Sequence, residues 1–495
     1  MSVANGSGYN EPYRPQFHFS APANWINDPN GLVYAHGVYH LFYQYKPEGA
    51  EGTLHWGHAT SRDLFHWQHQ PLAIYPHPVL GVPFSGSAVV DSRNTAGFKQ
   101  ADGDPDVLVA VYTHASVQGQ VQSLAYSCDQ GASWQEYTQN PVLSNPLNPD
   151  YRDPKVIWHD PSQQWVMVLA EGDHVGLYTS PNLRVWAHRQ AIGKAEWGGF
   201  GLCEMPDFFP LPVEGSTESS ESQENCWVLL VGVGKQAPNG GIGTGYLLGQ
   251  FDGQTFTPDD PHTLLWYEFG PDHYAGQSWS DTPAGRRINI AWMDNWRYAS
   301  RLPTSPWLGS MSVPRELRLL HTAAGIRLAN RPVPELGHLV QYSYPLTDAH
   351  TTDMQHLTDH LPELCCLDCT LEWGQANPPA DIGLLWCSAA GDRVRLSYQP
   401  AQGQLRLERV SVAALALPPE AVQPVLAQLP TLPAKLALQV VLDRGSIEVF
   451  ADGGLASITA LLFPAAELRQ LSLVVAGGEG ALVAGQVGVL ARVWA

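Results

Sequence analysis

Four short stretches of the chain share one pattern, and this pattern limits the fold more than any other feature of the sequence. In each stretch a strand-like run leads into a turn with an Asp or Asn, and an aromatic residue follows the turn. The aromatic residues are Trp67, Trp134, Trp186 and Phe256, which recur at intervals of 52 to 70 residues. Repeats of that length with about four strands each are typical of β-propeller blades, whereas a sandwich alone would lack so long a period.

The segments that open the predicted blades are rich in polar and turn-forming residues. A propeller arranges its blades around a central channel, so residues at the starts of the blades are expected to converge in one funnel. No sixth repeat is found before the pattern changes near residue 330. The five opening segments are "NDPNG" (27–31), "FSGSAVV" (84–90), "YRDPKVIW" (151–158), "CEMPDFFPL" (203–211) and "DHYAGQSWS" (272–280).

The last third of the chain has a different texture. After "RPVPELGHL" (331–339), Leu, Val and Ala alternate with polar residues, as in "AKLALQVVLDRGSIEVFADGG" (434–454). Such alternation suits a β-sandwich packed beside the propeller. We therefore predict an all-β chain of two domains, a five-bladed β-propeller over residues 1–335 and a C-terminal β-sandwich over residues 336–495.

The charge balance argues against two classes of partner. A formal net charge of −20 does not suit nucleic acid or an anionic membrane, because both require basic patches. An acidic chain with 17 Trp residues suits a neutral, polyhydroxylated ligand, since aromatic faces stack on the C–H surfaces of sugars. The expected partner is thus a small carbohydrate, and the choice between monomer and homodimer stays open.

Cysteine usage and the first residues bear on location and metal binding. The seven Cys are scattered, which fits reduced thiols, and the N-terminal stretch lacks the basic and apolar regions of a signal peptide. We expect a cytoplasmic protein unless a leader was removed. Cys366 and Cys369 form a lone C-x-x-C, and His55 and His58 belong to a strand, so no metal site and no cofactor are expected.

Three acids stand at predicted blade starts: Asp28, Asp153 and Glu204. Pro follows the first two directly and follows Glu204 by two positions, which stiffens the backbone at each acid. Burying several carboxylates together is costly unless chemistry uses the resulting separation of their pKa values. Glycoside hydrolysis needs such a set, with one carboxylate as nucleophile and a second carboxylic acid as proton donor.

The neighbours of these acids predict their roles. Asp28 lies in a polar, Asn-flanked turn and is expected to stay ionised, as a nucleophile must. Glu204 stands among Phe200, Leu202, Cys203 and Met205, so desolvation is expected to raise its pKa and make it the acid/base. Asp153 follows Arg152, which is expected to hold it charged for binding sugar hydroxyls.

The opening motifs resemble those of glycoside hydrolase family 32. "WINDPNG", "FSGS", "YRDP" and "CEMPD" occur in the family's order, and the agreement covers nearly the whole chain. The stretch "NWRYASRLPTSPWLGSMSVPREL" (295–317) looks like that of exo-acting levanases and exo-inulinases. The resemblance implies a five-bladed propeller with a sandwich, and hydrolysis of terminal β-D-fructofuranosides with retention. Sucrose, fructo-oligosaccharides and inulin or levan are the implied substrates.

The resemblance also implies which residues act. It makes Asp28 the nucleophile, Glu204 the acid/base and Asp153 the stabiliser of the transition state. Two positions depart from the family pattern: Met205 stands where the family usually has Cys, and Lys46 stands where it has Asn. The positions that match the fructose pocket are Asn27, Asn30, Gln44, Trp56, Phe84, Ser85, Arg152 and Trp296.

Two other functions remain open from the sequence. A fructosyltransferase would use the same acids but let a sugar hydroxyl attack the intermediate in place of water. A fructan-binding module without activity would keep the pocket and lose one acid, and all three acids are present here. The preference for β-2,1 or β-2,6 linkages depends on rim loops that the sequence does not reveal.

Overall fold

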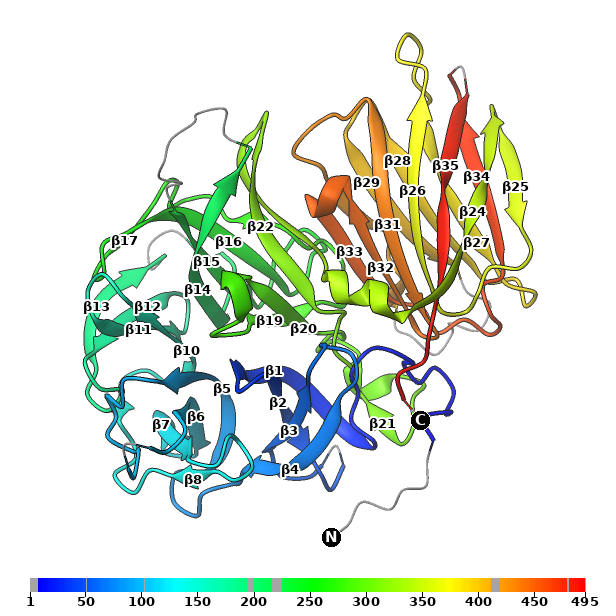
Figure 1. The fold of residues 1–495 in the computed structure, drawn as a ribbon. Coiled ribbons are helices and arrows are strands. Elements are labelled where there is room, and N and C mark those ends of the chain that lie inside the picture. The colour runs from blue at the N-terminus through cyan, green and yellow to red at the C-terminus, as the bar shows by residue number, and fades with distance from the viewer. Residues whose placement is uncertain are drawn as a thin grey trace.

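The structure is a computed structural model that describes residues 8–49, 51–101, 103–193, 197, 199–215, 225–410, 419–478 and 480–494. It consists of a β-propeller followed by a β-sandwich, which confirms the predicted fold class (Figure 1). Over these ranges the helices are short 3-10 turns, and none of them has the length and apolar character needed to cross a bilayer.

The propeller strands run from β1 to β23. Their bounds are β1 (Asn24–Ala35), β2 (Val38–Lys46), β3 (His55–Ser61), β4 (Gln68–Ile74), β5 (Val82–Asp91), β6 (Val107–Ser116), β7 (Gly119–Ser127), β8 (Gln135–Glu136), β9 (Leu143–Ser144), β10 (Tyr151–His159), β11 (Gln164–Glu171), β12 (Val175–Ser180), β13 (Ala187–Ile192), β14 (Cys203–Glu214), β15 (Asn225–Val233), β16 (Gly243–Phe251), β17 (Phe256–Pro258), β18 (Leu265–Trp266), β19 (Tyr274–Ser278), β20 (Ile288–Trp292), β21 (Trp307–Leu308), β22 (Arg315–Thr322) and β23 (Gly325–Pro332).

The sandwich strands and the 3-10 helices complete the described elements. They are β24 (Val340–Thr351), β25 (Met354–Thr358), β26 (Cys365–Trp373), β27 (Asp381–Cys387), β28 (Arg393–Gln399), β29 (Gln404–Val410), β30 (Val425–Gln428), β31 (Lys435–Asp443), β32 (Ser446–Ala451), β33 (Ala456–Leu461), β34 (Gln470–Ala476) and β35 (Ala481–Leu490), with η1 (Pro283–Gly285), η2 (Ala299–Arg301), η3 (Pro334–Leu339), η5 (Pro419–Val422) and η6 (Asp452–Gly454).

The inner strands of the propeller form a closed ring. β1 contacts β5, β5 contacts β10, β10 contacts β14, β14 contacts β19, and β19 returns to β1. These strands carry the five opening segments predicted from the sequence. The sheets of β1, β5 and β10 are separate, whereas β14 and β22 pair in parallel and join the last two groups of strands into one sheet. The count of five blades stays a prediction, which this ring supports.

The repeated Asp or Asn has a structural task in each group. Asp63, Asp129, Asn182 and Asp252 lie between the third and fourth strands, where their side chains accept hydrogen bonds from backbone N–H groups two to four residues ahead. Such caps fix the turn because Asn and Asp side chains mimic a backbone turn. The pattern seen in the sequence thus marks the outer hairpin of a blade.

The sandwich consists of two six-stranded sheets with the orders β24-β35-β26-β31-β32-β33 and β25-β34-β27-β28-β29-β30. Alternate side chains of the facing strands form its core, with Leu436, Leu438 and Val440 from β31 opposite Ile382 and Leu384 from β27. This burial follows from the period of two along a strand. The predicted boundary between residues 335 and 336 lies within η3.

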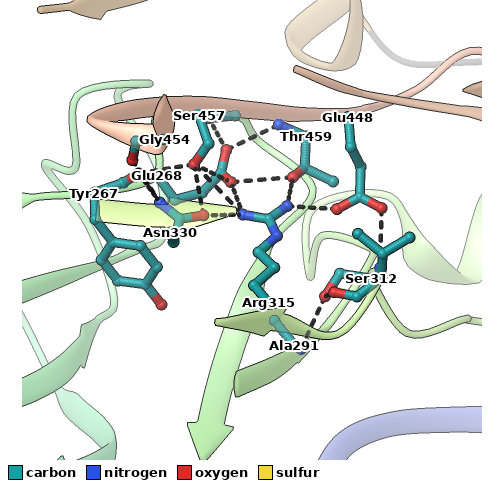
Figure 2. Close-up of polar contacts among 12 residues, drawn as sticks. Tyr267, Glu268, Ala291, Ser312, Arg315, Asn330, Glu448, Gly454, Ser457 and Thr459 are labelled. Atoms are coloured by element: carbon teal, nitrogen blue, oxygen red, sulfur yellow. Dashed lines mark hydrogen bonds and ion pairs between the residues drawn. The ribbon is translucent and has the colours of Figure 1, made fainter. Parts of the chain in front are cut away.

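A buried cluster of charges joins the propeller to the sandwich (Figure 2). Arg315 of β22 donates to Glu268 Oε2 at 2.5 Å and to Glu448 Oε2 of β32 at 2.5 Å. His18 lies 2.8 Å from Glu448 Oε1 and 2.8 Å from Asp443 Oδ2. Burial raises the pKa of Glu448, but Arg315 and His18 outweigh it and lower that pKa to about 2. Burial opposes the charge on His18, yet its two acidic partners raise its pKa to about 9.

Candidate active site

Every strand of the inner ring is irregular at the segment that opens its blade. A β-bulge adds a residue to one strand and re-aims the neighbouring side chains, and such bulges are frequent beside active sites. In three of the bulges a residue other than Gly takes a left-handed φ: 61° at Asp153, 47° at Met205 and 55° at Ala275. The shifts in register fall between Ile26 and Pro29, Pro83 and Gly86, Arg152 and Lys155, Glu204 and Asp207, and Tyr274 and Gln277.

Asp28 lies in the bulge of β1. Ser85 Oγ from the neighbouring β5 donates to Asp28 Oδ2 at 2.7 Å, while Oδ1 is buried without a protein partner among the described residues. Burial raises the pKa of Asp28 to about 6, a rise that Ser85 opposes and the charge of Glu204 strengthens. Burial makes Asp28 a weaker acid than its polar turn suggests, but a pKa of about 6 still leaves most of it ionised at neutral pH, so its expected ionised state stays a prediction.

Asp153 lies in the bulge of β10 with 6 % of its surface exposed. Its backbone N–H donates to Thr113 Oγ1 at 3.1 Å, and its Oδ2 accepts from the backbone N–H of Met205 at 3.1 Å. Burial raises the pKa of Asp153 to about 7, although Arg152 lowers it. Arg152 favours the charged form of Asp153, as expected, but desolvation outweighs a guanidinium whose nearest approach is 4.0 Å, so the net shift of the pKa is upward.

Glu204 opens β14 and has polar rather than apolar partners. Arg152 Nη2 donates to its Oε1 at 3.2 Å, and Tyr274 OH donates to its Oε2 at 2.6 Å. Its side chain is 27 % exposed. The apolar enclosure expected from the sequence is not formed, since Leu202 is 42 % exposed and Met205 packs into a separate cluster beside Trp25.

Arg152 is the shared cation of the site. It contacts Glu204, lies 4.0 Å from Asp153 and donates to Asp150 Oδ1 at 2.7 Å. The charges of Asp28, Asp153 and Glu204 also act on one another, so the structure brings the three predicted acids together. One guanidinium lies beside two of the three carboxylates, and with a pKa of about 7 Asp153 is partly protonated near neutral pH.

A network of amides supports the floor around Asp28. With its amide oriented to satisfy both neighbours, Asn30 donates to Ser85 Oγ at 3.2 Å and accepts from Gln44 Nε2 at 3.0 Å. Asn27 Oδ1 accepts from Trp25 Nε1 at 2.8 Å. The predicted binding residues Asn27, Asn30, Gln44 and Ser85 are thus gathered on β1, β2 and β5 beside the nucleophile candidate.

The predicted aromatic residues of the pocket lie in two settings. Trp296 is 48 % exposed, with its ring centroid 5.9 Å from that of Trp25 and 4.6 Å from that of Trp292. Phe84 is half-buried. Trp56 is completely buried, and its Nε1 donates to the Phe84 carbonyl at 3.0 Å. Trp56 differs from the prediction because it supports the backbone of Phe84 and presents no open face to a ligand.

Tyr274 is the main residue that the sequence analysis missed. It is buried, donates to Glu204 and immediately precedes the bulge of β19, as Arg152 and Glu204 precede theirs. Its motif, "DHYAGQSWS", stands among the five opening segments, so aligning the five bulges would have singled it out. Among the described residues, no group of three or more His, Cys, Asp and Glu side chains is arranged to hold a metal ion.

Comparisons with known proteins agree along almost the whole chain. Residues 18–332 match the glycosyl hydrolases family 32 N-terminal domain, and residues 341–489 match the C-terminal domain of the same family. A levanase from Bacillus subtilis is 39 % identical over 99 % of this chain and 72 % of its own length. An extracellular exo-inulinase from Aspergillus niger is 35 % identical over 96 % of this chain and 94 % of its own. The crystal structure of an exo-inulinase from Aspergillus awamori superposes with a TM-score of 0.88 at 32 % identity, covering 99 % of this chain and 100 % of that one.

Proposed function

Because the chain belongs to glycosyl hydrolase family 32, we propose that it is a retaining exo-β-fructofuranosidase. It removes terminal, non-reducing β-D-fructofuranosyl residues from sucrose, fructo-oligosaccharides, and inulin or levan. The observation that carries the proposal is the convergence of Asp28, Asp153 and Glu204 at the bulges of the inner ring, where Arg152 lies beside Asp153 and Glu204. Relatives named levanase, exo-inulinase and invertase support the substrate class.

In the first step, a carboxylate oxygen of Asp28 forms a bond to the anomeric carbon C2 of the terminal fructosyl unit. The bond from C2 to the leaving sugar breaks, and Glu204 gives its proton to the departing oxygen. In the second step, water attacks C2 and releases Asp28, and the proton of that water returns to Glu204. Two displacements restore the β configuration.

The surroundings of each acid suit these tasks. Ser85 orients Asp28 through one oxygen and leaves Oδ1 without a protein partner. Arg152 and Tyr274 hold both oxygens of Glu204 in one orientation, which limits the directions in which its proton can travel. Asp153, fixed by the Met205 N–H, is the acceptor for fructosyl hydroxyls, and the exposed ring of Trp296 is a stacking surface at the rim.

Product analysis tests this proposal. Sucrose should yield equimolar glucose and fructose, and inulin should release fructose singly from the first minutes onward. Adding methanol should give methyl β-D-fructofuranoside, because methanol then replaces water in the second step with retention. The methyl α anomer would exclude two displacements, and early di- or trisaccharides would indicate an endo-acting enzyme.

The same reactions separate the other functions. Accumulation of trisaccharides from concentrated sucrose, at the expense of free fructose, would identify a fructosyltransferase. Binding of inulin without any product would identify a fructan-binding module.

A further inference from the structure

A second hollow lies beside the site, between the second and third groups of strands. Its volume is about 480 Å³, within the range of roughly 300–1,000 Å³ typical of small-molecule sites. One wall comes from β9 and the residue after it. The other wall includes Tyr151, Glu171, His174, Tyr178, Trp186 and His188. This hollow is called the lateral groove below.

The floor of the lateral groove is a network of hydrogen-bonded polar side chains. Tyr151 OH donates to Tyr178 OH at 3.0 Å, Tyr178 OH donates to Glu171 Oε1, and His174 Nε2 lies 3.3 Å from Glu171 Oε2. Glu171 reaches Tyr178 only because position 176 is Gly, where a Cβ would lie 2.1 Å from Glu171 Oε1. The hydroxyl and carboxylate oxygens retain capacity to accept further hydrogen bonds.

The lateral groove and the carboxylate cluster of Asp28, Asp153 and Glu204 lie on either side of the backbone at residues 150–152 and 171–172. Tyr151 lines the groove, and the next residue, Arg152, points to Glu204, because successive side chains of a strand face opposite ways. Glu171 lines the groove, and the next residue, Gly172, accepts the backbone N–H of Cys203 at 2.6 Å. Gly172 lies next to Asp150 and adds no side chain to this stretch of backbone, which is called the ridge below.

The chemistry of the lateral groove selects a neutral, hydroxyl-rich ligand. The single carboxylate of the floor is already paired with His174, so the floor has no free charge to hold an ion, and a hydrogen-bonded floor does not favour an apolar molecule. Hydroxyls can donate to Glu171, while the ring of Trp186, whose Nε1 is already bound to the Leu183 carbonyl at 2.8 Å, offers contact to C–H groups.

We propose that the lateral groove binds fructosyl units of a β-fructan chain beyond the leaving sugar, and so favours oligosaccharides over sucrose. This inference rests on the proposed function. Sucrose ends at its leaving glucose and does not reach across the ridge. A chain of four or five units does reach, so its additional contacts lower KM without a comparable change in kcat.

A chain-length series on the wild-type enzyme tests the inference without any variant. KM should fall at least fivefold between sucrose and a tetra- or pentasaccharide of the same linkage, and then level off when the lateral groove is filled. Equal KM values for all lengths would overturn the inference while leaving the proposed function intact. Absence of hydrolysis of every substrate would instead overturn the proposed function.

Two variants locate the effect in the groove. Glu171→Gln keeps the shape of the floor and removes its charge, and His188→Ala shortens a solvent-exposed wall residue. Each should reduce the ratio of kcat/KM for the pentasaccharide to that for sucrose at least threefold. Met354→Ser, an exposed position on the sandwich, is the matched control and should leave the ratio unchanged. Wild-type ratios in both folded groove variants, checked by thermal melting, would place the chain-length effect elsewhere and overturn the assignment.

Discussion

Two clusters of acids in this protein have opposite electrostatic outcomes. In the carboxylate cluster of Asp28, Asp153 and Glu204, Arg152 lies beside two of the three acids, and burial raises the pKa of Asp28 to about 6 and that of Asp153 to about 7. In the cluster between the domains, the pKa of Glu448 is lowered to about 2 although its side chain is completely buried. Burial alone therefore does not decide the protonation of an acid.

The difference lies in the number of compensating partners. Glu448 contacts both Arg315 and His18 and also accepts from the Val313 N–H, so its charge is better satisfied in the fold than its burial would suggest. The funnel acids have fewer donors, and Asp28 Oδ1 has no protein partner among the described residues. Acids with few hydrogen-bond donors and counter-charges keep raised pKa values, which suits acid–base chemistry. An acid with a full set of such partners stays ionised, which suits a structural contact between domains.

Asp28→Asn should produce the largest effect and act on activity alone. The amide cannot form the covalent bond to C2, so kcat for sucrose should fall at least about 10³-fold, toward the range lost with essential catalytic groups. Its melting temperature at pH 8 should equal or exceed that of the wild type, because an under-compensated buried charge is removed. Asp252→Asn is the control and should keep a near-normal kcat. Asn182 caps the corresponding turn of another group of strands, so an Asn can replace the Asp there. Activity within tenfold of wild type would exclude Asp28 as nucleophile.

Glu448→Gln should break the other cluster and act on stability. It leaves Arg315 with one fewer buried counter-charge, which should cost about 3 kcal/mol of unfolding free energy, measured by urea denaturation. Glu372→Gln, at the exposed ion pair with Lys435, should cost less than about 1 kcal/mol. Equal effects of the two substitutions would show that the cluster between the domains is no better compensated than a surface pair.

Much of the fold could be predicted because its signals are local. Each outer hairpin is capped through backbone groups a few residues away, by Asp63, Asp129, Asn182 or Asp252. Because the same cap recurs in each group of strands, the repeat can be recognised in the sequence. The five opening segments likewise indicate where the inner strands lie. Partnerships between distant residues were not readable: Arg315 and Glu448 are 133 residues apart, and nothing in either local sequence indicates the other.

The carboxylate cluster shows the same limit. Its three acids were predicted from their positions at the blade starts, but their electrostatics were inferred from sequence neighbours that face elsewhere. Met205 follows Glu204 in sequence yet packs beside Trp25, and the partner that binds Glu204 is Tyr274, 70 residues away. The positions of the three acids along the inner ring were therefore predictable from the sequence. Their solvation and their hydrogen-bond donors could be known only from the folded structure.

Tyr274→Phe should have an intermediate effect on the carboxylate cluster. It removes the hydroxyl that donates to Glu204 Oε2 at 2.6 Å, and a hydrogen bond to a charged group contributes roughly 1.5–3 kcal/mol, so kcat for sucrose should fall about tenfold or more. The loss should be much smaller for an aryl β-D-fructofuranoside whose leaving group needs no proton. Tyr126→Phe, on an outer strand, is the control. Equal losses for both substrates would indicate general damage to the pocket instead of misplacement of Glu204.

The smallest expected effects concern stability against pH, and the acids Asp28 and Glu448 contribute with opposite sign. The pKa of Asp28 is raised in the fold, from 3.8 to about 6, so its protonated form contributes stability below pH 3.8 that is lost as pH rises through about 6. The pKa of Glu448 is lowered, from 4.5 to about 2, so its contribution is present above pH 4.5 and is lost as pH falls through about 2. The pKa of His18 is raised from 6.5 to about 9, so its charged form contributes stability below pH 6.5 that is lost as pH rises through about 9.

Calorimetric melting temperatures from pH 3 to 10 should therefore change less between pH 4 and 6 in Asp28→Asn, and less between pH 6.5 and 9 in His18→Gln, than in the wild type. If Asp28→Asn instead flattened the alkaline range, the proton of the funnel would reside on another group, and the contrast between the two clusters would fail at its central residue.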